Sequence, residues 1–212
     1  MIWFIDIDGC LCDNRESFIR RCSTWLTNNM IEHKDPVMSE YYFGDIFGVD
    51  KMLHIPCFES EEFAGYYIED PMDGAVEFLQ EVKDRGDMVV ILTAREADSR
   101  IPITEELHAF LGKNYESRKS IAIGVITQIW LQRHNIPYDN VIYRKDKVAL
   151  CKEHAYCAIA IDDDPKILEG YINNNINCVS MRTEYNDGKA DLEADTWFDI
   201  HRMLNAGILD SN

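Results

Sequence analysis

The chain has 212 residues, 46% of them hydrophobic, which suits one sizeable domain or a core with a small insertion. Its 21 lysines and arginines against 38 aspartates and glutamates give a formal net charge of −17. This charge argues against general binding to nucleic acid or acidic membranes, although one small phosphorylated substrate held by local cations and a metal is compatible with it.

The sequence also predicts a soluble, cytoplasmic protein. No apolar run reaches the length of a membrane span, and acids interrupt the first apolar run, which therefore does not resemble a signal peptide. The seven cysteines are scattered, as expected for reduced thiols. Cys10 and Cys12 suggest a soft-metal site, but no second pair or nearby histidine completes one, so zinc is not expected.

A short apolar run at the start of the chain predicts a buried strand that ends in Asp6 and Asp8. Residues i and i+2 of a strand lie on the same side, so these carboxylates leave the strand close together. Two unpaired carboxylates repel each other and lose hydration, so a fold keeps them there mainly when a cation holds them. The plainer alternative is a pair of solvated acids before a turn at Gly9.

The next segment predicts a helix followed by a less regular insertion. Apolar residues at 3–4 spacing predict a helix over 14–29, and residues 30–69 look like a small, mostly helical insertion. The insertion contains an aromatic cluster at Tyr41, Tyr42, Phe43 and Phe47. These side chains line a substrate lid, form a dimer face or build the insertion's own core, and the core interpretation is favoured over the lid.

Regular alternation resumes at Pro71. A helix is expected over 74–85 with Gly86 in the left-handed conformation after it, then a buried strand over 88–93. Residues 97–118 are polar with one possible helix. The remaining expected elements are a helix over 120–135, a strand over 141–143, a helix from Lys147, a strand over 158–161, a helix over 167–174, a last core strand over 178–181 and a helix near 199–205.

Alternating strands and helices predict an α/β fold, a parallel sheet with helices on both faces and right-handed crossovers. Ligands of such sheets bind outside the carboxyl ends of the strands. The residues expected at those ends are Asp6, Asp8, Thr93, Lys147, Asp162 and Asp163. No glycine-rich nucleotide-cofactor motif is present, which makes a dinucleotide-binding protein a weak alternative.

These residue types fit phosphoryl transfer. One carboxylate can attack phosphorus, and a second can protonate the leaving oxygen and later activate water. A hydroxyl and a lysine can hold the phosphoryl oxygens. The remaining acids can complete an oxygen site for Mg²⁺.

The segments IDIDG, ILTAR, RKDK and AIDDDP together resemble the haloacid dehalogenase superfamily of aspartate-nucleophile phosphatases. The resemblance implies a Rossmann-like core over residues 1–15 and 70–212 and a small helical cap over 16–69. It implies a Mg²⁺-dependent phosphomonoesterase acting on a small phosphorylated metabolite.

The resemblance also implies a role for each motif residue. Asp6 would be the nucleophile and Asp8 the general acid and base, while Thr93, Ala94 and Arg95 would bind the substrate. Lys147 would neutralise the nucleophile–phosphate pair. The implied magnesium ligands are Asp6, the backbone carbonyl of Asp8, and Asp162 with or without Asp163.

Within the superfamily, Pro71–Ala75, Asp146–Lys147 and the paired acids of the last motif resemble the 5'(3')-deoxyribonucleotidase-like group, which implies a (deoxy)nucleoside monophosphate as substrate. A second resemblance, to the phosphatase domain of phage polynucleotide kinase, implies a 3'-end polynucleotide phosphatase, against which the net charge argues. A binding protein that keeps the fold without catalysis is a third alternative, although no motif acid is missing.

Several residues depart from the pattern or leave a choice open. Cys10 stands where the family usually has threonine. We expect this difference to adjust the activity rather than to abolish it. Residues 97–126 are longer than expected, so a substrate loop there could differ. Lys145 is a rival of Lys147 for the phosphate lysine. Arg95 contacts a second phosphate or a base, or it is a structural ion-pair partner.

Overall fold

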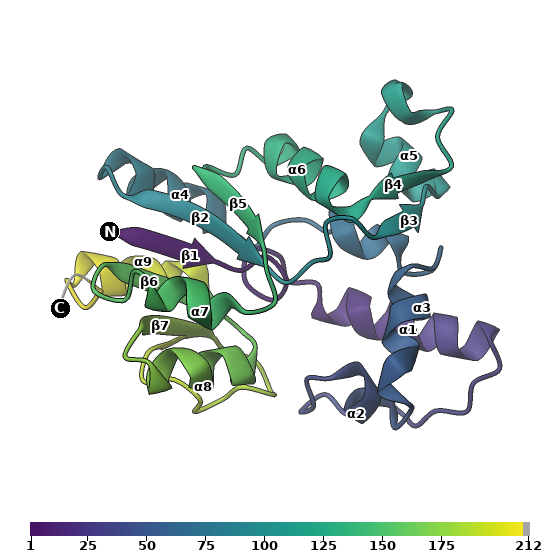
Figure 1. Cartoon of the computed structure of the whole chain (residues 1–212), viewed down its shortest axis with the longest axis horizontal. Helices are drawn as coiled ribbons and strands as arrows, with labels where there is room; N and C mark the ends of the chain where they lie inside the picture. Colours follow the sequence, from purple (N-terminus) through teal and green to yellow (C-terminus); the bar gives the residue numbers. More distant parts are fainter. Residues whose placement is uncertain (210–212) are drawn as a thin grey trace. The chain divides into compact units, whose positions relative to one another are not determined.

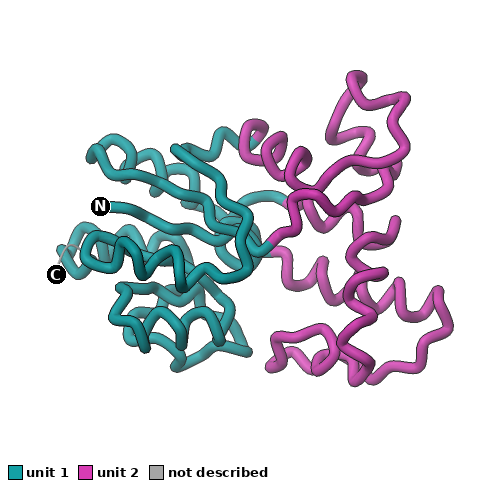
Figure 2. The backbone as a smooth tube through the Cα atoms, viewed as in Figure 1, with its two compact units in different colours: residues 1–13, 70–94, 134–212 teal, residues 14–69, 95–133 magenta. Residues whose placement is uncertain are grey.

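The computed structural model describes residues 1–209 and divides into two compact units (Figure 2). Unit 1 takes Met1–Asp13, Asp70–Ala94 and the chain from His134 onward. Unit 2 takes Asn14–Glu69 and Arg95–Arg133. Residues 95–133 are expected in the α/β core, but they belong to the same compact unit as the insertion.

Unit 1 is built on a parallel sheet. Within residues 1–209 its six strands follow the order β5-β2-β1-β6-β7-β8, and each neighbouring pair is parallel. Their bounds are β1 Ile2–Ile5, β2 Met88–Thr93, β5 Asn140–Tyr143, β6 Ala158–Asp162, β7 Asn177–Met181 and β8 Glu193–Ala194. The predicted α/β fold with a parallel sheet is therefore confirmed. The strand predicted over 178–181 is confirmed as β7, but it is not the last strand, because β8 follows it. The two residues of β8 are too few to leave a sequence pattern.

Helices cover both faces of this sheet (Figure 1). On one face, α4 (Ala75–Asp84) and α9 (Trp197–Asn205) pack through Phe78, whose ring centroid lies 5.3 Å from the rings of both Trp3 and Trp197. On the other face, α7 (Lys147–Lys152) and α8 (Pro165–Asn173) share a buried cluster with Phe4. Because successive strand residues alternate between faces, Trp3 and Phe4 belong to opposite layers.

Unit 2 has a separate apolar core. Its first segment contains α1 (Arg15–Asn28), α2 (Phe43–Phe47), η1 (Lys51–Leu53), α3 (His54–Phe58) and η2 (Ala64–Ile68). Its second segment contains β3 (Arg100–Pro102), α5 (Glu105–Leu111), η3 (Lys113–Tyr115), β4 (Ser120–Ala122) and α6 (Ile123–Arg133). Ile101, Leu107 and Ile126 are fully buried in one cluster with Phe47, which explains why residues 95–133 join the insertion. The antiparallel pair β3–β4 is a correction, since residues 120–122 were expected to be helical.

The aromatic cluster of the insertion is divided between core and surface. Phe43 and Phe47 are buried in the core of unit 2, whereas Tyr42 is 48% exposed.

Within residues 1–209, none of the helices combines the length and the hydrophobicity that crossing a membrane requires.

Candidate active site

The loop after β1 carries the first pair of acids. Ile5 lies in register with Ile161, so Asp6 follows β1 at the level where Asp162 ends β6, and the Asp6 amide donates to the Ile161 carbonyl at 3.0 Å. Asp6 is buried and Asp8 is half-buried. Because β1 and β6 are adjacent parallel strands, Asp6 and Asp162 come together at the carboxyl end of the sheet.

Lys147 provides a positive charge at the carboxyl ends of β1 and β6. It is the first residue of α7, whose N-cap Asp146 accepts a hydrogen bond from the Ala149 amide at 3.2 Å. The Lys147 ammonium lies 2.9 Å from Asp6 Oδ1 and 2.9 Å from Asp162 Oδ2, and the side chain is only 3% exposed. One lysine thus bridges the carboxylates that follow two adjacent strands.

The three consecutive acids after β6 have different environments. Asp162 is held by Lys147 and also accepts a hydrogen bond from the Asp164 amide at 3.1 Å. Asp164 is the N-cap of α8 and accepts from the amides of Lys166 and Ile167 at 2.8 and 3.3 Å. Such N-cap hydrogen bonds stabilise a helix start by about 1 kcal/mol, so Asp164 has a structural role.

Asp163 is positioned by two residues, Tyr185 and Asn186, that the sequence motifs do not indicate. The Tyr185 hydroxyl donates to Asp163 Oδ2, and the Asn186 side-chain amide donates to the Asp163 backbone carbonyl at 2.8 Å. Asn186 is fully buried and also donates to the Met181 carbonyl at 2.9 Å. Their one signal in the sequence is that they follow β7, whose carboxyl end lies beside that of β6.

Gly9 makes room for Asp163. It has a φ of +78°, and a Cβ atom added to it would lie 2.2 Å from Asp163 Oδ2. A side chain at this position would therefore collide with the carboxylate as well as strain the backbone. The glycine of IDIDG is required by a close approach between the first and the last motif.

Burial and crowding weaken the acidity of Asp6. Burial, together with the charges of Asp162 and Asp8, raises the pKa of Asp6 to about 7, although the Lys147 charge acts in the opposite direction. Burial lowers the affinity of Lys147 for its proton, but attraction to Asp162 and Asp6 outweighs this effect and raises the pKa of Lys147 above its usual range. Lys147 is therefore a permanent cation.

The pKa of Asp163 is raised as well. Burial, followed by the charges of Asp6 and Asp162, raises the pKa of Asp163 well above its usual range, despite the hydrogen bond from Tyr185. Asp163 is 3% exposed, and its Oδ1 accepts no hydrogen bond from the described residues. A buried carboxylate oxygen without a partner costs about 1–3 kcal/mol, more when charged, unless a cation fills the position.

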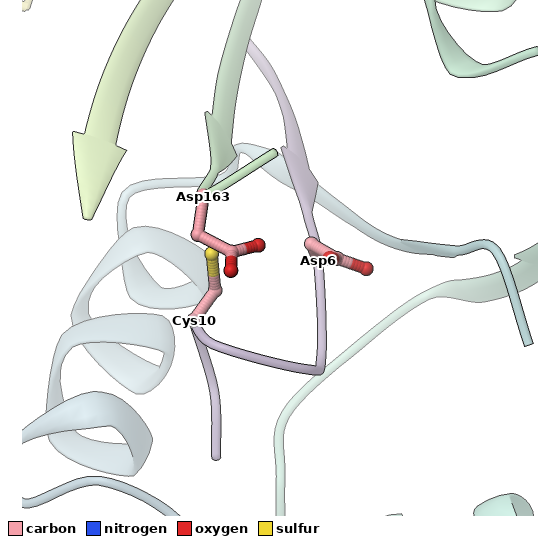
Figure 3. Close-up of side chains that lie close together, drawn as sticks. All are labelled: Asp6, Cys10 and Asp163. Atoms are coloured by element: carbon pink, nitrogen blue, oxygen red, sulfur yellow. The ribbon is translucent and has the colours of Figure 1, made fainter. Parts of the chain in front are cut away.

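The donor set fits a divalent cation such as Mg²⁺. Asp6, Asp162 and Asp163 are buried close together, and Lys147 provides one positive charge for the three acids. Three ionised carboxylates would exceed this charge. Burial and this excess raise the pKa values of Asp6 and Asp163, and a divalent cation would stabilise the ionised forms. Carboxylate oxygens are the ligands that Mg²⁺ prefers. Ligand atoms of Asp6, Cys10 and Asp163 all lie within 4.8 Å of one another (Figure 3). Lys147 donates a hydrogen bond to Asp162, whereas Asp163 Oδ1 accepts none within residues 1–209.

Thr93 and Ala94 lie at the same edge. Thr93 is the last residue of β2, pairs with Tyr143 of β5 and is fully buried, and its carbonyl accepts the Arg144 amide at 2.8 Å. Ala94 follows it and is exposed. The register of β1, β2 and β6 thus places Thr93 one residue beyond the level of Asp6 and Asp162.

Lys145 and Arg95 have other surroundings. Lys145 is exposed, in contrast to the buried Lys147. Arg95 belongs to unit 2, where its Nη1 donates to Thr127 Oγ1 at 3.2 Å and its guanidinium lies 5.2 Å from the ring centroid of Tyr67. A role of Arg95 in substrate binding stays a prediction.

Several solved structures with this fold are described as phosphatases or hydrolases. A predicted phosphatase from Clostridium acetobutylicum is 14% identical with a TM-score of 0.65, over 97% of this chain and 98% of that one. A haloacid dehalogenase-like hydrolase from Streptococcus pneumoniae is 11% identical with a TM-score of 0.58, over 96% and 97%. An aspartyl-phosphate intermediate analogue of phosphoserine phosphatase is 12% identical with a TM-score of 0.54, over 97% of each chain. These likenesses show a common fold.

A comparison of the whole sequence with family models identifies the family. The model described as "5' nucleotidase, deoxy (Pyrimidine), cytosolic type C protein" matches residues 1–209, and a comparison with curated proteins gave no match. The family match makes the chain a hydrolase rather than a binding protein without catalysis. The chain belongs to the 5' nucleotidase, deoxy (pyrimidine), cytosolic type C family, and it is a phosphatase of the haloacid dehalogenase type.

Proposed function

We propose that this protein is a Mg²⁺-dependent phosphomonoesterase that hydrolyses a (deoxy)nucleoside monophosphate. The observation that carries the proposal is the buried cluster of Asp6, Lys147 and Asp162 at the carboxyl ends of β1 and β6. The family description names pyrimidine deoxynucleotides, so pyrimidine deoxynucleoside monophosphates are the first substrates to test. The same description supports the expected cytosolic location.

In the proposed reaction, the Asp6 carboxylate attacks phosphorus and forms an aspartyl phosphate while the bond to the nucleoside oxygen breaks. Asp8 gives its proton to that leaving oxygen. Asp8 then takes a proton from water as the water oxygen attacks phosphorus, which releases inorganic phosphate and restores Asp6. Thr93 and the amide of Ala94 bind phosphoryl oxygens.

Asp6, the Asp8 carbonyl and Asp163 would hold Mg²⁺, with Asp162 orienting Lys147. When bound, the ion would supply positive charge that offsets the repulsion between nucleophile and phosphate. Asp163 is favoured over Asp162 as the direct ligand because its Oδ1 accepts no hydrogen bond within residues 1–209, whereas Asp162 already pairs with Lys147. Lys147 is favoured over Lys145 as the phosphate lysine, because Lys147 is buried in contact with Asp6 whereas Lys145 is exposed.

The test is phosphate release from a panel of 5'- and 3'-(deoxy)nucleotides, sugar phosphates and a 3'-phosphorylated oligonucleotide, with Mg²⁺ and with EDTA. We expect release from mononucleotides, fastest for pyrimidine deoxynucleotides, and none after chelation. Release from the oligonucleotide alone would move the assignment to nucleic-acid end repair. Equal release with and without metal would overturn the metal-dependent mechanism.

A further inference from the structure

The thiol of Cys10 lies beside two carboxylates of the proposed magnesium site, and the proposed mechanism gives it no task. Ligand atoms of Asp6, Cys10 and Asp163 all lie within 4.8 Å of one another, and the three side chains are 6%, 0% and 3% exposed (Figure 3). The group therefore offers a sulfur and carboxylate oxygens to the same small space.

The backbone around Cys10 is fixed on both sides. Its amide donates to the Ile7 carbonyl at 3.2 Å, and its carbonyl accepts the Trp197 indole N–H at 2.9 Å. The neighbouring amides of Gly9 and Cys12 are also used, since they donate to the Cys12 and Ile7 carbonyls at 2.9 Å each. The sulfur is therefore pre-positioned, and a bound ion would not have to order a loose loop.

An independent observation points to a cation at this position. Asp163 Oδ1 is buried and accepts no hydrogen bond from residues 1–209. Tyr185 and Asn186 hold the rest of Asp163 in place. An all-oxygen site suits Mg²⁺, but a site with one sulfur also suits ions such as Zn²⁺, Co²⁺ and Cd²⁺, which accept thiolate, imidazole and carboxylate ligands.

We infer that Asp6, Cys10 and Asp163 bind a thiophilic divalent cation through the Cys10 sulfur, in competition with Mg²⁺. On binding, the S–H bond breaks, a sulfur–metal bond forms and the proton passes to solvent, so no oxidant or reductant is needed. The inference extends the proposed function, because the same carboxylates would hold Mg²⁺ during turnover. The outcome is an enzyme that zinc inhibits at its own metal site.

The direct test uses Co²⁺ as the probe, in the full chain and with a thiol-free reductant. We expect a saturable sulfur-to-cobalt charge-transfer absorption in the near ultraviolet for the wild type, and its loss in Cys10→Ser and Cys10→Thr. Excess Mg²⁺ should displace the ion and reduce the absorption. Circular dichroism of each variant shows whether it is folded, and the Asp163→Asn variant provides a second route, with apparent Co²⁺ affinity reduced at least about tenfold.

Two control variants separate this site from other thiols. Cys12→Ser removes the other buried thiol of the same loop and should keep the absorption. Cys22→Ser breaks the buried pair in unit 2 in which the Cys22 and Cys57 sulfurs lie 3.7 Å apart, the rival soft-metal site, and should also keep it. Loss of the absorption in Cys22→Ser with its retention in Cys10→Ser would assign the bound metal to unit 2 and overturn the inference.

Inhibition gives a second readout. Zn²⁺ should inhibit Mg²⁺-dependent phosphate release, and Cys10→Thr should raise the Zn²⁺ concentration for half-inhibition at least about tenfold relative to that variant's own activity. The cobalt measurement needs no turnover, so it can fail while the phosphatase activity is present, and it can succeed if no tested substrate is hydrolysed. Absence of any cobalt–sulfur absorption in the folded wild type would refute the inference.

Discussion

Asp6 is the residue on which the proposed chemistry depends most. We expect Asp6→Asn to lower phosphate release by at least about a thousandfold, because the amide cannot attack phosphorus. The fold should persist, since asparagine has nearly the same shape and its neutrality relieves repulsion with Asp162 and Asp8. Asp13→Asn, an exposed acid in the same loop, is the matched control and should retain turnover. A fully active Asp6→Asn enzyme would exclude Asp6 as nucleophile.

The same substitution, made once at Lys147 and once at Lys145, shows which of the two acts as the phosphate lysine. Lys147→Met leaves the buried carboxylates of Asp6 and Asp162 without their cation, and breaking a buried charge pair in this way costs about 3–5 kcal/mol of unfolding free energy. Lys145 is exposed, so Lys145→Met should change stability by less than about 1 kcal/mol. Urea unfolding measures the difference, and phosphate release from folded protein should be lost in Lys147→Met alone. The opposite ranking of activities would transfer the role to Lys145.

The raised pKa of Asp6 predicts how stability depends on pH in the metal-free protein. Burial and neighbouring charges raise this pKa from 3.8 to about 7, so the folded state holds the proton more tightly than the unfolded state. The stability contributed by the protonated form is complete below pH 3.8 and is lost as the pH rises through about 7. In EDTA, the unfolding free energy of the wild type relative to Asp6→Asn should therefore fall across this window. A flat difference would contradict the assigned pKa, and added Mg²⁺ should restore stability above it.

At the scale of elements, the loop after β1 depends on Gly9. A Cβ atom there would meet Asp163 Oδ2 at 2.2 Å, whereas one at Gly86 would meet no described atom within 4 Å. Both glycines have positive φ, +78° and +84°, so Gly9→Ala and Gly86→Ala share a backbone cost of about 1 kcal/mol. Only Gly9→Ala should in addition displace Asp163 and abolish Mg²⁺-dependent turnover. Thermal unfolding and phosphate release of the two variants measure these effects. Equal stability and equal activity would show that the loop accommodates the added methyl group at Gly9 without displacing Asp163.

The elements of unit 1 could be predicted because each has a strong local signal. The apolar run of β2 and the periodic pattern of α4 agree with their observed bounds to within a residue or so. The expected meeting of Asp6, Lys147, Asp162 and Asp163 followed from one rule, that parallel strands align their carboxyl ends. Local patterns contain no such rule for loops. The contacts of Tyr185 and Asn186 with Asp163, and the place of Cys10, depend on chain paths that spacing does not encode.

At the scale of the whole molecule, the division into two units was only partly predictable. The sequence indicates that residues 30–69 interrupt the α/β pattern. It does not separate 95–133 from the core, because the periodicity of a helix does not reveal which core the helix will join. The structure resolves this through shared burial, with Ile101 and Ile126 packed in the same cluster as Phe47. The net charge of −17 indicates which partners the chain repels, but it carries no information about the division into two units.

A buried arginine joins the two segments of unit 2. Arg21 of α1 is 8% exposed, and its guanidinium contacts both carboxylate oxygens of Glu106 in α5 at 2.9 and 3.3 Å. It also contacts Ser17 Oγ at 2.9 Å and the Glu62 carbonyl at 3.2 Å. A Cβ atom on Gly65 would lie 2.3 Å from Arg21 Nη2, so the surrounding backbone is fitted closely around the guanidinium.

We therefore expect Arg21→Met to loosen unit 2. Hydrogen bonds to charged groups contribute about 1.5–3 kcal/mol each, so their loss should reduce amide-exchange protection in α1 and α5, while β1 and β6 of unit 1 keep theirs. Arg20→Met is the matched control, because Arg20 is the adjacent arginine, its side chain is 65% exposed and it lies 3.9 Å from Glu69. Exposed pairs contribute about 0–1 kcal/mol, so this control should leave exchange in α1 and α5 nearly unchanged. Identical exchange in the two variants would show that shared apolar burial alone holds residues 14–69 and 95–133 together.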